Sequence, residues 1–520
     1  MSTPHATAAR GLTSAGRSPS FQGRFGRMFG HLPAASFGPV DSIIEQNLNA
    51  LGAAMTAKFE PLNEKPDEEE SGIPALYTYL GQFIDHDITF DPASSLQKQN
   101  DLDALTDFRT PAFDLDNVYG RGPSDQPYMH DADGRFLTGE QLTGGNPSAR
   151  DLPRNAPPSD LSSADKQNFS RRALIGDPRN DENSIISHLQ GLFHRFHNNT
   201  IRDNPGMAFE EVQELVRFHY QYVVLNDFLP RIVSDTVLTR LKVNGHYDRA
   251  GLKFYRWRND PYMPVEFAGA VYRLGHSMVR PGYRLNDNIL LPIFPVPANS
   301  GDGLTGFRAM GSDRAIDWGR FIDIDARAYG GDGATFDAAN KQRLQFAYRL
   351  DTSLVNPLGG LPAAIASNPS SLAARNLLRG WRLGLPSGQK VADAMGEARI
   401  DDKDIMLGKA IKGVKPNPAT DPTVKNILDV SSAFEGNCPL WTYILAEAAL
   451  HQSSVTLPVS GAATKIMSPR LGPVGGRIVA EVFVGMMLGD STSLLKRAPH
   501  WQPKSGAGYA LKDFVAYALS

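Results

Sequence analysis

Helical periodicity recurs along most of the 520-residue chain and limits the folds that the chain can adopt. In these stretches apolar residues return every three or four positions, which is the pattern of helices with one buried face. The clearest segments are residues 73–89, 185–204, 209–229, 265–279, 341–350, 440–450 and 477–488. Strand-like alternation is confined to short candidates at 240–243 and 251–255. The sequence therefore predicts one large, mainly α-helical domain with long Pro- and Gly-rich loops and little β structure.

The first forty residues differ from the rest of the chain because they contain four arginines and no acid. We expect residues 1–34 to form a flexible basic arm, with a targeting or docking tag as the alternative, and residues 35–520 to form the folded domain. The arm lacks the long apolar run of a secretory signal. The most apolar segment, 478–488, is interrupted by Glu481 and is shorter than the ~18 residues of a membrane span. We therefore expect no transmembrane segment, and a protein that is cytoplasmic or exported without a cleavable signal peptide.

Overall charge and cysteine content exclude some classes of protein. The net charge of −3 gives no reason to expect a nucleic-acid partner. Cys438 is the single cysteine, so no intramolecular disulfide can form, which suits a reducing compartment. The sequence leaves the oligomeric state open.

The segment 80–87, Leu-Gly-Gln-Phe-Ile-Asp-His-Asp, places several polar side chains on one helix. At 100° per residue, Gln82, Asp85 and His86 fall within an arc of about 100°, and Asp87 lies roughly 100° beyond His86. Polar groups gathered on one face beside aromatic residues are costly to bury without a function. A candidate catalytic face is therefore predicted, and a capped helix end with solvated acids is the local alternative.

In a second segment, four candidate calcium ligands occur at every second position. Thr110, Ala112, Asp114 and Asp116 would face the same way in an extended loop. Calcium takes six to eight oxygen ligands from carboxylates, hydroxyls and carbonyls, and Asp87 together with this loop could supply them. The spacing is not that of an EF-hand, and the loop alone would be interpreted as a solvated acidic turn.

Two further segments contain histidine or arginine in helical surroundings. Residues 176–182 read Gly-Asp-Pro-Arg-Asn-Asp-Glu, and Arg179 taken alone would be a surface residue. His194 and His197 stand three apart on the next helix without the glutamate of a zinc-protease motif, which favours helix packing over metal binding. Residues 267–276 form a segment of small residues that ends at His276, and a lone histidine there is more often a core residue than a ligand.

The segments 81–87, 114–120, 176–182, 267–276 and 376–379 together resemble, in the same order, the motifs of the animal haem peroxidase (peroxidase–cyclooxygenase) superfamily. They are similar to the motifs of myeloperoxidase, lactoperoxidase and their bacterial relatives, and a bacterial member is expected. Residues 471–481 also look like bacterial members, with a packing role.

The resemblance implies a haem b site between two histidines. His276 would be the axial ligand of the iron, with Asn376 accepting the other N–H of its imidazole, and Arg273 and Arg379 would hold the haem propionates. His86 and Arg179 would act on peroxide, and Gln82 would order water or a halide.

The resemblance also implies covalent attachment and a calcium ion. Asp85 and Glu182 would form ester links to the haem. Asn183 stands where myeloperoxidases have the methionine of a sulfonium link, so that link should be absent. The expected calcium ligands are Asp87, Thr110, Ala112, Asp114 and Asp116.

The function implied by the resemblance is reduction of hydrogen peroxide through an oxoferryl intermediate, with oxidation of a halide or a small organic or phenolic donor. His86 would take a proton from the inner peroxide oxygen and return it to the outer one. The alternative is a fatty-acid dioxygenase of the same superfamily, which has a tyrosine three residues before the proximal histidine. Here that position is Arg273, and Tyr272 is four before. A catalytically dead interaction module is a third reading, disfavoured because His86, Arg179, His276 and Asn376 are all present.

Overall fold

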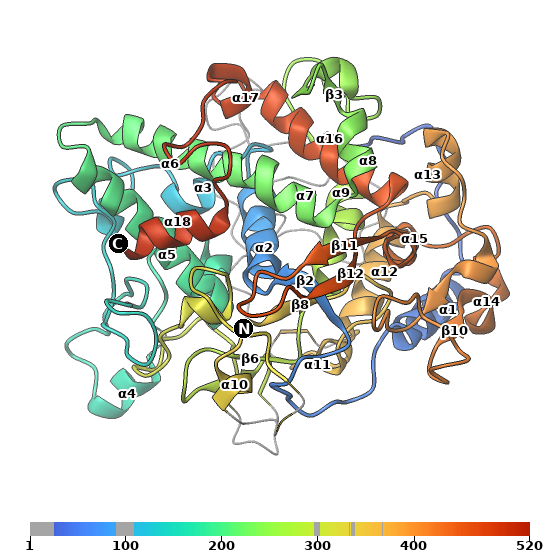
Figure 1. Ribbon diagram of the computed structural model, residues 1–520, viewed down its shortest axis with the longest axis horizontal. Coiled ribbons are helices and arrows are strands. Elements are labelled where there is room, and N and C mark those ends of the chain that lie inside the picture. Colours follow the sequence, from blue (N-terminus) through green and yellow to red (C-terminus); the bar gives the residue numbers. More distant parts are fainter. Residues whose placement is uncertain are drawn as a thin grey trace.

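The computed structural model describes residues 25–89, 109–169, 171–295, 302–331, 333, 338–363, 365–366 and 368–520. Helices dominate these residues (Figure 1). The longer ones are α1 (Asp41–Ala54), α2 (Leu76–Ile88), α5 (Ser184–Asp203), α6 (Phe209–Val223), α12 (Leu372–Arg382), α13 (Gly388–Met395), α15 (Leu440–Leu450), α16 (Pro473–Gly489) and α18 (Leu511–Leu519). The shorter ones are α3 (Asp116–Tyr119), α4 (Ser163–Asn168), α7 (Leu229–Ile232), α8 (Asp235–Arg240), α9 (Val265–Gly269), α10 (Ala338–Lys341), α11 (Asn356–Gly359), α14 (Ile427–Val430) and α17 (Leu494–Arg497).

The strands among the described residues form only two-stranded sheets. They are β1 (Phe25–Gly26) with β5 (Met263–Pro264), β2 (Glu70–Pro74) with β8 (Phe346–Tyr348), β3 (Lys242–Val243) with β4 (His246–Tyr247), β6 (Gly282–Arg284) with β7 (Leu290–Pro292), β9 (Met406–Leu407) with β10 (Lys425–Asn426), and β11 (Gln452–Thr456) with β12 (Lys465–Pro469). This confirms the predicted mainly α-helical domain with little β structure. None of the described helices has both the length and the apolarity to cross a membrane.

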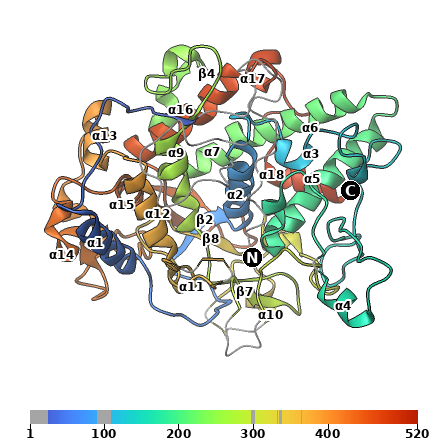
Figure 2. The same cartoon turned by 180° about the vertical axis from the view of Figure 1, so that it is seen from behind.

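Helix α2 lies at the centre of the molecule. Figures 1 and 2 place it between α5, α6 and α18 on one side and α1, α12, α13 and α15 on the other. Its apolar residues are almost completely buried, and the Phe83 ring stacks on Phe193 of α5 with centroids 4.3 Å apart. Because α2 is enclosed on both sides, its polar residues are held inside the protein and must meet protein partners or a ligand.

Several predicted helices are confirmed, but the segment 341–350 is not helical. Helix α10 ends at Lys341, and residues 346–348 form strand β8, which pairs with β2. Phe346, Ala347 and Tyr348 are all buried in that pairing, so apolar spacing that looked helical reflects burial on both sides of a strand.

Two other predictions are corrected by local contacts. The segment 265–279 breaks after Gly269 into α9 and a 3₁₀ segment, η6 (Val271–His276), since Ala270 adopts φ −139° and ψ −67°. The segment 251–255 forms no strand, because backbone N–H groups of Lys253, Phe254 and Tyr255 donate instead to the buried carboxylate of Glu481. The other strand candidate, 240–243, shortens to β3.

Residues 1–24 of the expected arm, 1–34, lie outside the described residues. Its last part packs against the body of the protein: β1 pairs with β5, and the N–H groups of Met28 and Phe29 donate to the Glu266 carboxylate. Phe29 is only 1% exposed. The described end of the predicted arm, from residue 25 on, is therefore packed against the folded body.

Candidate active site

The polar face of α2 meets the turn that precedes α5. His86, 4% exposed, has its Nδ1 2.7 Å from Oδ1 of Asn180 and its Nε2 3.5 Å from Oε1 of Glu182. Gln82 Nε2 donates to the same Glu182 oxygen, and Asn183 Nδ2 donates to Gln82 Oε1 at 3.3 Å. The structure thus brings together two predicted catalytic residues and one predicted haem-linking carboxylate.

Arg179 fastens this turn to the end of α2. Its Nη2 donates to the backbone oxygens of His86 (3.0 Å) and Thr89 (2.7 Å), and its Nη2 and Nε both bond to the carboxylate of Asp177. Arg109 binds the same carboxylate. Although burial acts to raise the pKa of Asp177, the two guanidinium groups, with a smaller contribution from His86, hold it well below its usual range. The predicted peroxide-side arginine therefore lies beside His86 and is ion-paired.

The proximal residues come from η6 and α12. Asn376, 2% exposed, has its side-chain Nδ2 2.8 Å from Nδ1 of His276, and Arg273 Nη1 donates to Asn376 Oδ1 at 3.4 Å. Burial, with a smaller effect of Arg273, lowers the pKa of His276 to about 3, so the imidazole is neutral at physiological pH. The structure brings Asn376 and His276 together, and places Arg379 one helical turn further along α12.

The two halves of the site touch. The Tyr272 hydroxyl on η6 donates to the backbone oxygen of Gly81 on α2 at 3.2 Å. Asp85, whose side chain also accepts from Thr89, acts electrostatically to raise the pKa values of both Tyr272 and Arg273. Burial is the larger influence on both groups; it raises the pKa of Tyr272 and lowers that of Arg273. His86 and His276 therefore stand on neighbouring elements, α2 and η6.

The two glycines of the proximal segment serve different purposes. A side chain at Gly275, next to His276, would meet open space, so a flat group could approach the backbone there. At Gly269 a Cβ would lie 2.6 Å from Cδ1 of Leu383. Gly269 thus lies in close contact with the side chain of Leu383, in the segment after α12, and does not face open space.

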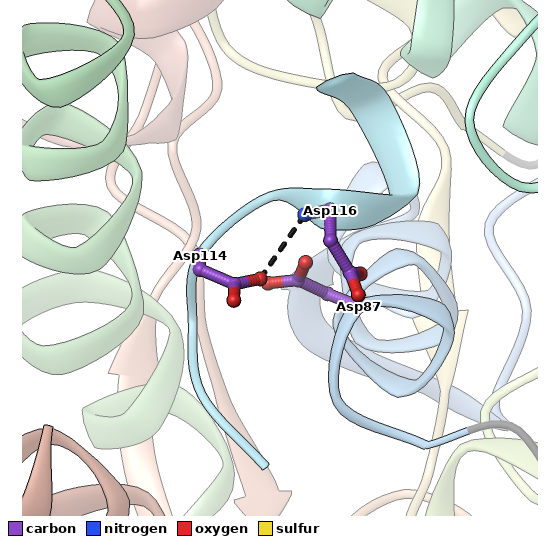
Figure 3. A group of neighbouring side chains, drawn as sticks. All are labelled: Asp87, Asp114 and Asp116. Carbon is purple, nitrogen blue, oxygen red and sulfur yellow. Dashed lines mark hydrogen bonds between the residues drawn. The ribbon is translucent and has the colours of Figure 1, made fainter. Parts of the chain in front are cut away.

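Three aspartates converge beside α2 (Figure 3). Asp87 comes from α2, Asp116 from α3 and Asp114 from the loop before it, and each offers an oxygen within 4.8 Å of the others. Both oxygens of Asp87 and Oδ1 of Asp116 are buried without a hydrogen-bond partner. Burial, with repulsion from the neighbouring aspartates, raises the pKa of Asp87, and burial raises that of Asp116 to about 8.

The rest of the predicted ligand loop borders this cluster. The Thr110 hydroxyl donates to Asp114 Oδ2 at 2.6 Å, and the Ala112 N–H donates to the Thr110 carbonyl at 2.8 Å. Arg109 Nη1 lies 3.3 Å from Asp116 Oδ1 and partly balances the negative charge. The chemistry of the donor set, carboxylates with a hydroxyl and carbonyls, is that of a hard cation such as calcium.

Sequence reasoning missed Asn180, although it stands next to Arg179 in a segment that the sequence singled out. Asn180 matters for the site because it bonds the imidazole of His86. Asn180 lies in a 3₁₀ turn, η3 (Pro178–Asp181), and the direction of its side chain depends on that turn. The other histidines considered as metal ligands are packing residues: His197 bonds Tyr119 and the Gly134 carbonyl, and His194 pairs with Gln190.

Solved structures share this fold. Peroxidase A from Dictyostelium discoideum superposes with a TM-score of 0.57 at 12% identity, covering 96% of this chain and 94% of that one. A fatty acid alpha-dioxygenase from Arabidopsis thaliana superposes with a TM-score of 0.51 at 14% identity, covering 95% of this chain and 77% of that one. The chain therefore shares the fold of these two enzymes, and the predicted fold is confirmed.

Sequence comparisons match part of the chain. Residues 105–295 match the animal haem peroxidase family. Heme peroxidase 2 of Caenorhabditis elegans is 23% identical over 41% of this chain, and chorion peroxidase of Drosophila melanogaster is 26% identical over 42%. The matched part of the chain is therefore similar to animal haem peroxidases. The aligned part amounts to 36% of the worm protein and 26% of the fly protein.

Proposed function

We propose that the protein is a haem peroxidase that reduces hydrogen peroxide and oxidises a halide or a small organic or phenolic donor. The observation that carries the proposal is the placement of His86 and His276 on touching elements, each held by a buried asparagine. His86 lies beside the Glu182 carboxylate, the Gln82 amide and the Arg179 guanidinium. His276 is neutral, as an iron ligand must be.

The residues around His276 fit a haem. Iron binds a nitrogen that carries no proton, so Nδ1 must carry the proton and donate it to an acceptor while Nε2 binds the metal. Turning the Asn376 amide by 180° presents Oδ1 to Nδ1 in place of Nδ2, and the two ends of an amide have nearly the same shape. Arg273 would release Asn376 to pair with a haem propionate, and Arg379 is proposed to bind the other one.

Haem, when bound, supplies the redox-active iron at which peroxide is reduced. The protein's own part is proton transfer and charge stabilisation. His86 Nε2 takes the proton of the first peroxide oxygen and returns it to the second as the O–O bond breaks. Gln82 orders water or a halide beside it. Arg179 holds the His86 backbone, and its charge favours the negative oxygen that develops as the bond breaks.

We further propose that Asp85 and Glu182 form ester links to the haem, and that Asp87, Asp114, Asp116, Thr110 and the Ala112 carbonyl bind calcium. The buried oxygens of Asp87, which lack hydrogen-bond partners, support the calcium assignment, because unneutralised buried carboxylates are unfavourable. A bound divalent cation would also fix the end of α2 next to His86.

A fatty-acid dioxygenase is the second candidate, supported by the fold likeness to the Arabidopsis enzyme. The geometry of η6 favours the peroxidase. In a 3₁₀ segment residues three apart lie on the same face, so Arg273 shares the face of His276 and Tyr272 is turned about 120° away. The Tyr272 hydroxyl is also bonded to the Gly81 carbonyl.

The test uses the purified protein loaded with haem. Addition of peroxide should produce spectral changes that a phenolic donor or bromide reverses, whereas oxygen uptake with a long-chain fatty acid should be absent. His86→Ala should keep its haem and slow the peroxide-consuming step by at least ~10²-fold. The exposed His246→Ala is the matched control. An unchanged rate in His86→Ala would make His86 a structural residue, and fatty-acid-dependent oxygen uptake would favour the dioxygenase.

A further inference from the structure

A row of buried side chains connects His86 to the interior of α5. Asn180 Oδ1 lies 2.7 Å from Nδ1 of His86, Asn180 Nδ2 donates to Gln190 Oε1 at 2.7 Å, and Gln190 Nε2 lies 2.8 Å from Nε2 of His194. Asn180 and Gln190 are completely buried, and His194 is 1% exposed. Water therefore cannot replace any of these partners, and the row forms one hydrogen-bonded unit.

The bonds of this row can run in only two directions. A side-chain amide has one donor end and one acceptor end, and a neutral imidazole has one nitrogen that donates and one that accepts. Reversing any one bond therefore reverses all the others. The nitrogen of His86 that carries the proton is set by the state of His194 at the far end.

The amide groups of Asn180 and Gln190 give the direction. Asn180 Nδ2 faces Oε1 of Gln190, and Gln190 Nε2 faces Nε2 of His194, so each amide donates away from His86. Burial, with repulsion from His197 and His130, lowers the pKa of His194 to about 3, so its imidazole is neutral and its Nε2 can accept from Gln190. Gln190 must then donate to His194, Asn180 must donate to Gln190, and His86 Nδ1 must donate to Asn180.

We propose that Asn180, Gln190 and His194 are positioning residues that hold the one proton of neutral His86 on Nδ1 and leave Nε2 free to accept a proton. This inference deepens the proposed function and rests on it, since an unprotonated Nε2 is what peroxide activation requires. The reverse direction would require both amide groups to be turned by 180° and would put a proton on the wrong nitrogen of His86.

The carboxylate of Glu182 explains why positioning residues are needed at His86. Glu182 Oε1 lies 3.5 Å from His86 Nε2 and would attract a proton to that nitrogen. The Asn180 contact is shorter at 2.7 Å and is buried, and Glu182 Oε1 already accepts from Gln82. The hydrogen bonds from His86 to His194 thus oppose the attraction of the proton by Glu182. Removing the Asn180 amide should let the proton move to Nε2 of His86.

The first experiment reads the protonated nitrogen directly in the full chain without haem. Histidines labelled with ¹⁵N give long-range ¹⁵N–¹H spectra that distinguish Nδ1–H from Nε2–H, and the signals of His86 are those lost in His86→Gln. At pH 8 we expect Nδ1–H in the wild type, a shift to Nε2–H in Asn180→Leu, and Nδ1–H again in Asn180→Asp, whose carboxylate accepts. Asn199→Leu, an amide of α5 that bonds to backbone oxygens of Tyr517 and Ala518 and to the Arg202 guanidinium, should leave His86 unchanged.

The second experiment measures how fast cyanide binds to the haem-loaded protein. Hydrogen cyanide must give up its proton as it binds, so the rate reports an unprotonated base beside the iron. Asn180→Leu and Gln190→Met should slow binding by about 10- to 100-fold, the scale for partners that fix an imidazole's orientation. Asn180→Asp should stay within a few-fold of the wild type, and Asn199→Leu should match it.

Two results would overturn the inference: Nε2–H on wild-type His86, or Asn180→Asp binding cyanide as slowly as Asn180→Leu, which would make Asn180 a packing residue. If Asn180→Leu fails to fold, Gln190→Met and Asn180→Asp still decide between these outcomes. Neither readout requires peroxide or a donor. A wild type that binds haem but does not turn over would therefore defeat the proposed function without changing these results.

Discussion

At the scale of single residues, His276 carries the cofactor assignment. Its neutral imidazole and its buried asparagine partner are the features of an iron ligand. We predict that His276→Ala loses haem or loses turnover, because the site offers no second histidine on η6 to bind the iron. The absorption spectrum after haem loading and the rate of donor oxidation measure both effects, with His246→Ala as control. A variant with a normal haem spectrum and full activity would refute the assignment.

The carboxylates of Asp85 and Glu182 lead to a second prediction at this scale. Glu182 keeps 34% of its side chain exposed beside His86, and Asp85 acts electrostatically on Tyr272 and Arg273 across the site. Peroxide turnover should therefore produce ester links that survive extraction in acidic organic solvent. Because Asn183 has no thioether, the sulfonium link should be absent.

Mass spectrometry of peroxide-treated wild type, Asp85→Ala and Glu182→Ala would measure the links one at a time. Each variant should lose one ester and retain the other. Haem that extracts completely from the treated wild type would contradict the ester proposal and leave the ligation by His276 untouched.

At the scale of elements, the calcium proposal concerns how α2 is held against the loop before α3. Without a cation, burial and then repulsion from Asp114 and Asp116 raise the pKa of Asp87. We predict that calcium stabilises the wild type, by about 2.7 kcal/mol when its concentration is 100 times its Kd. Asp87→Asn should lose this gain and be more stable than the wild type in chelator. Thermal unfolding with EDTA or calcium tests this, with the exposed Asp133→Asn as control. Equal unfolding temperatures of the wild type in both buffers would argue against a calcium site.

Some helices could be predicted from the sequence with their bounds, and some segments could not. Helices with one polar face, such as α5, were predicted within a residue or two, and α15 was predicted with its bounds. The segment 341–350 failed because the apolar spacing of a strand buried in the core resembles that of a helix. The segment 251–255 failed because its partner, Glu481, lies more than 200 residues away.

The candidate site was predicted unevenly for a similar reason. His86, Gln82, Glu182, His276 and Asn376 were found through motifs, and the structure brings them into two contacting groups. The hydrogen-bonded row from His86 to His194 was not predicted, because it depends on how η3 turns Asn180 toward α2 and α5. Side-chain directions of this kind follow from tertiary contacts and not from spacing.

At the scale of the whole molecule, buried ionisable groups set how stability depends on pH. Burial raises the pKa values of Asp351 and Glu447 to about 7, so these acids keep protons in the folded state that the unfolded chain loses above about pH 4 to 4.5. The contribution of these two acids to the free energy of unfolding decreases as pH rises toward 7. Burial lowers the pKa values of His194 and His197 to about 3 and about 4, so their stabilising effect falls as pH drops below 6.5.

These opposite effects predict that the free energy of unfolding is largest between about pH 4.5 and 6.5 and decreases on both sides. Glu447→Gln should flatten the decrease toward pH 7, because each such group contributes about 1.4 kcal/mol per pH unit between its unfolded and folded pKa values. The Glu447 carboxylate accepts from the N–H groups of Val474 and Gly475, and the glutamine oxygen can still accept from them. Apparent unfolding temperatures from pH 4 to 9, at one scan rate and ionic strength, would measure the profile, with the exposed Glu210→Gln as control. A Glu447→Gln profile that is parallel to the wild type from pH 4.5 to 7 would show that Glu447 is ionised in the folded protein.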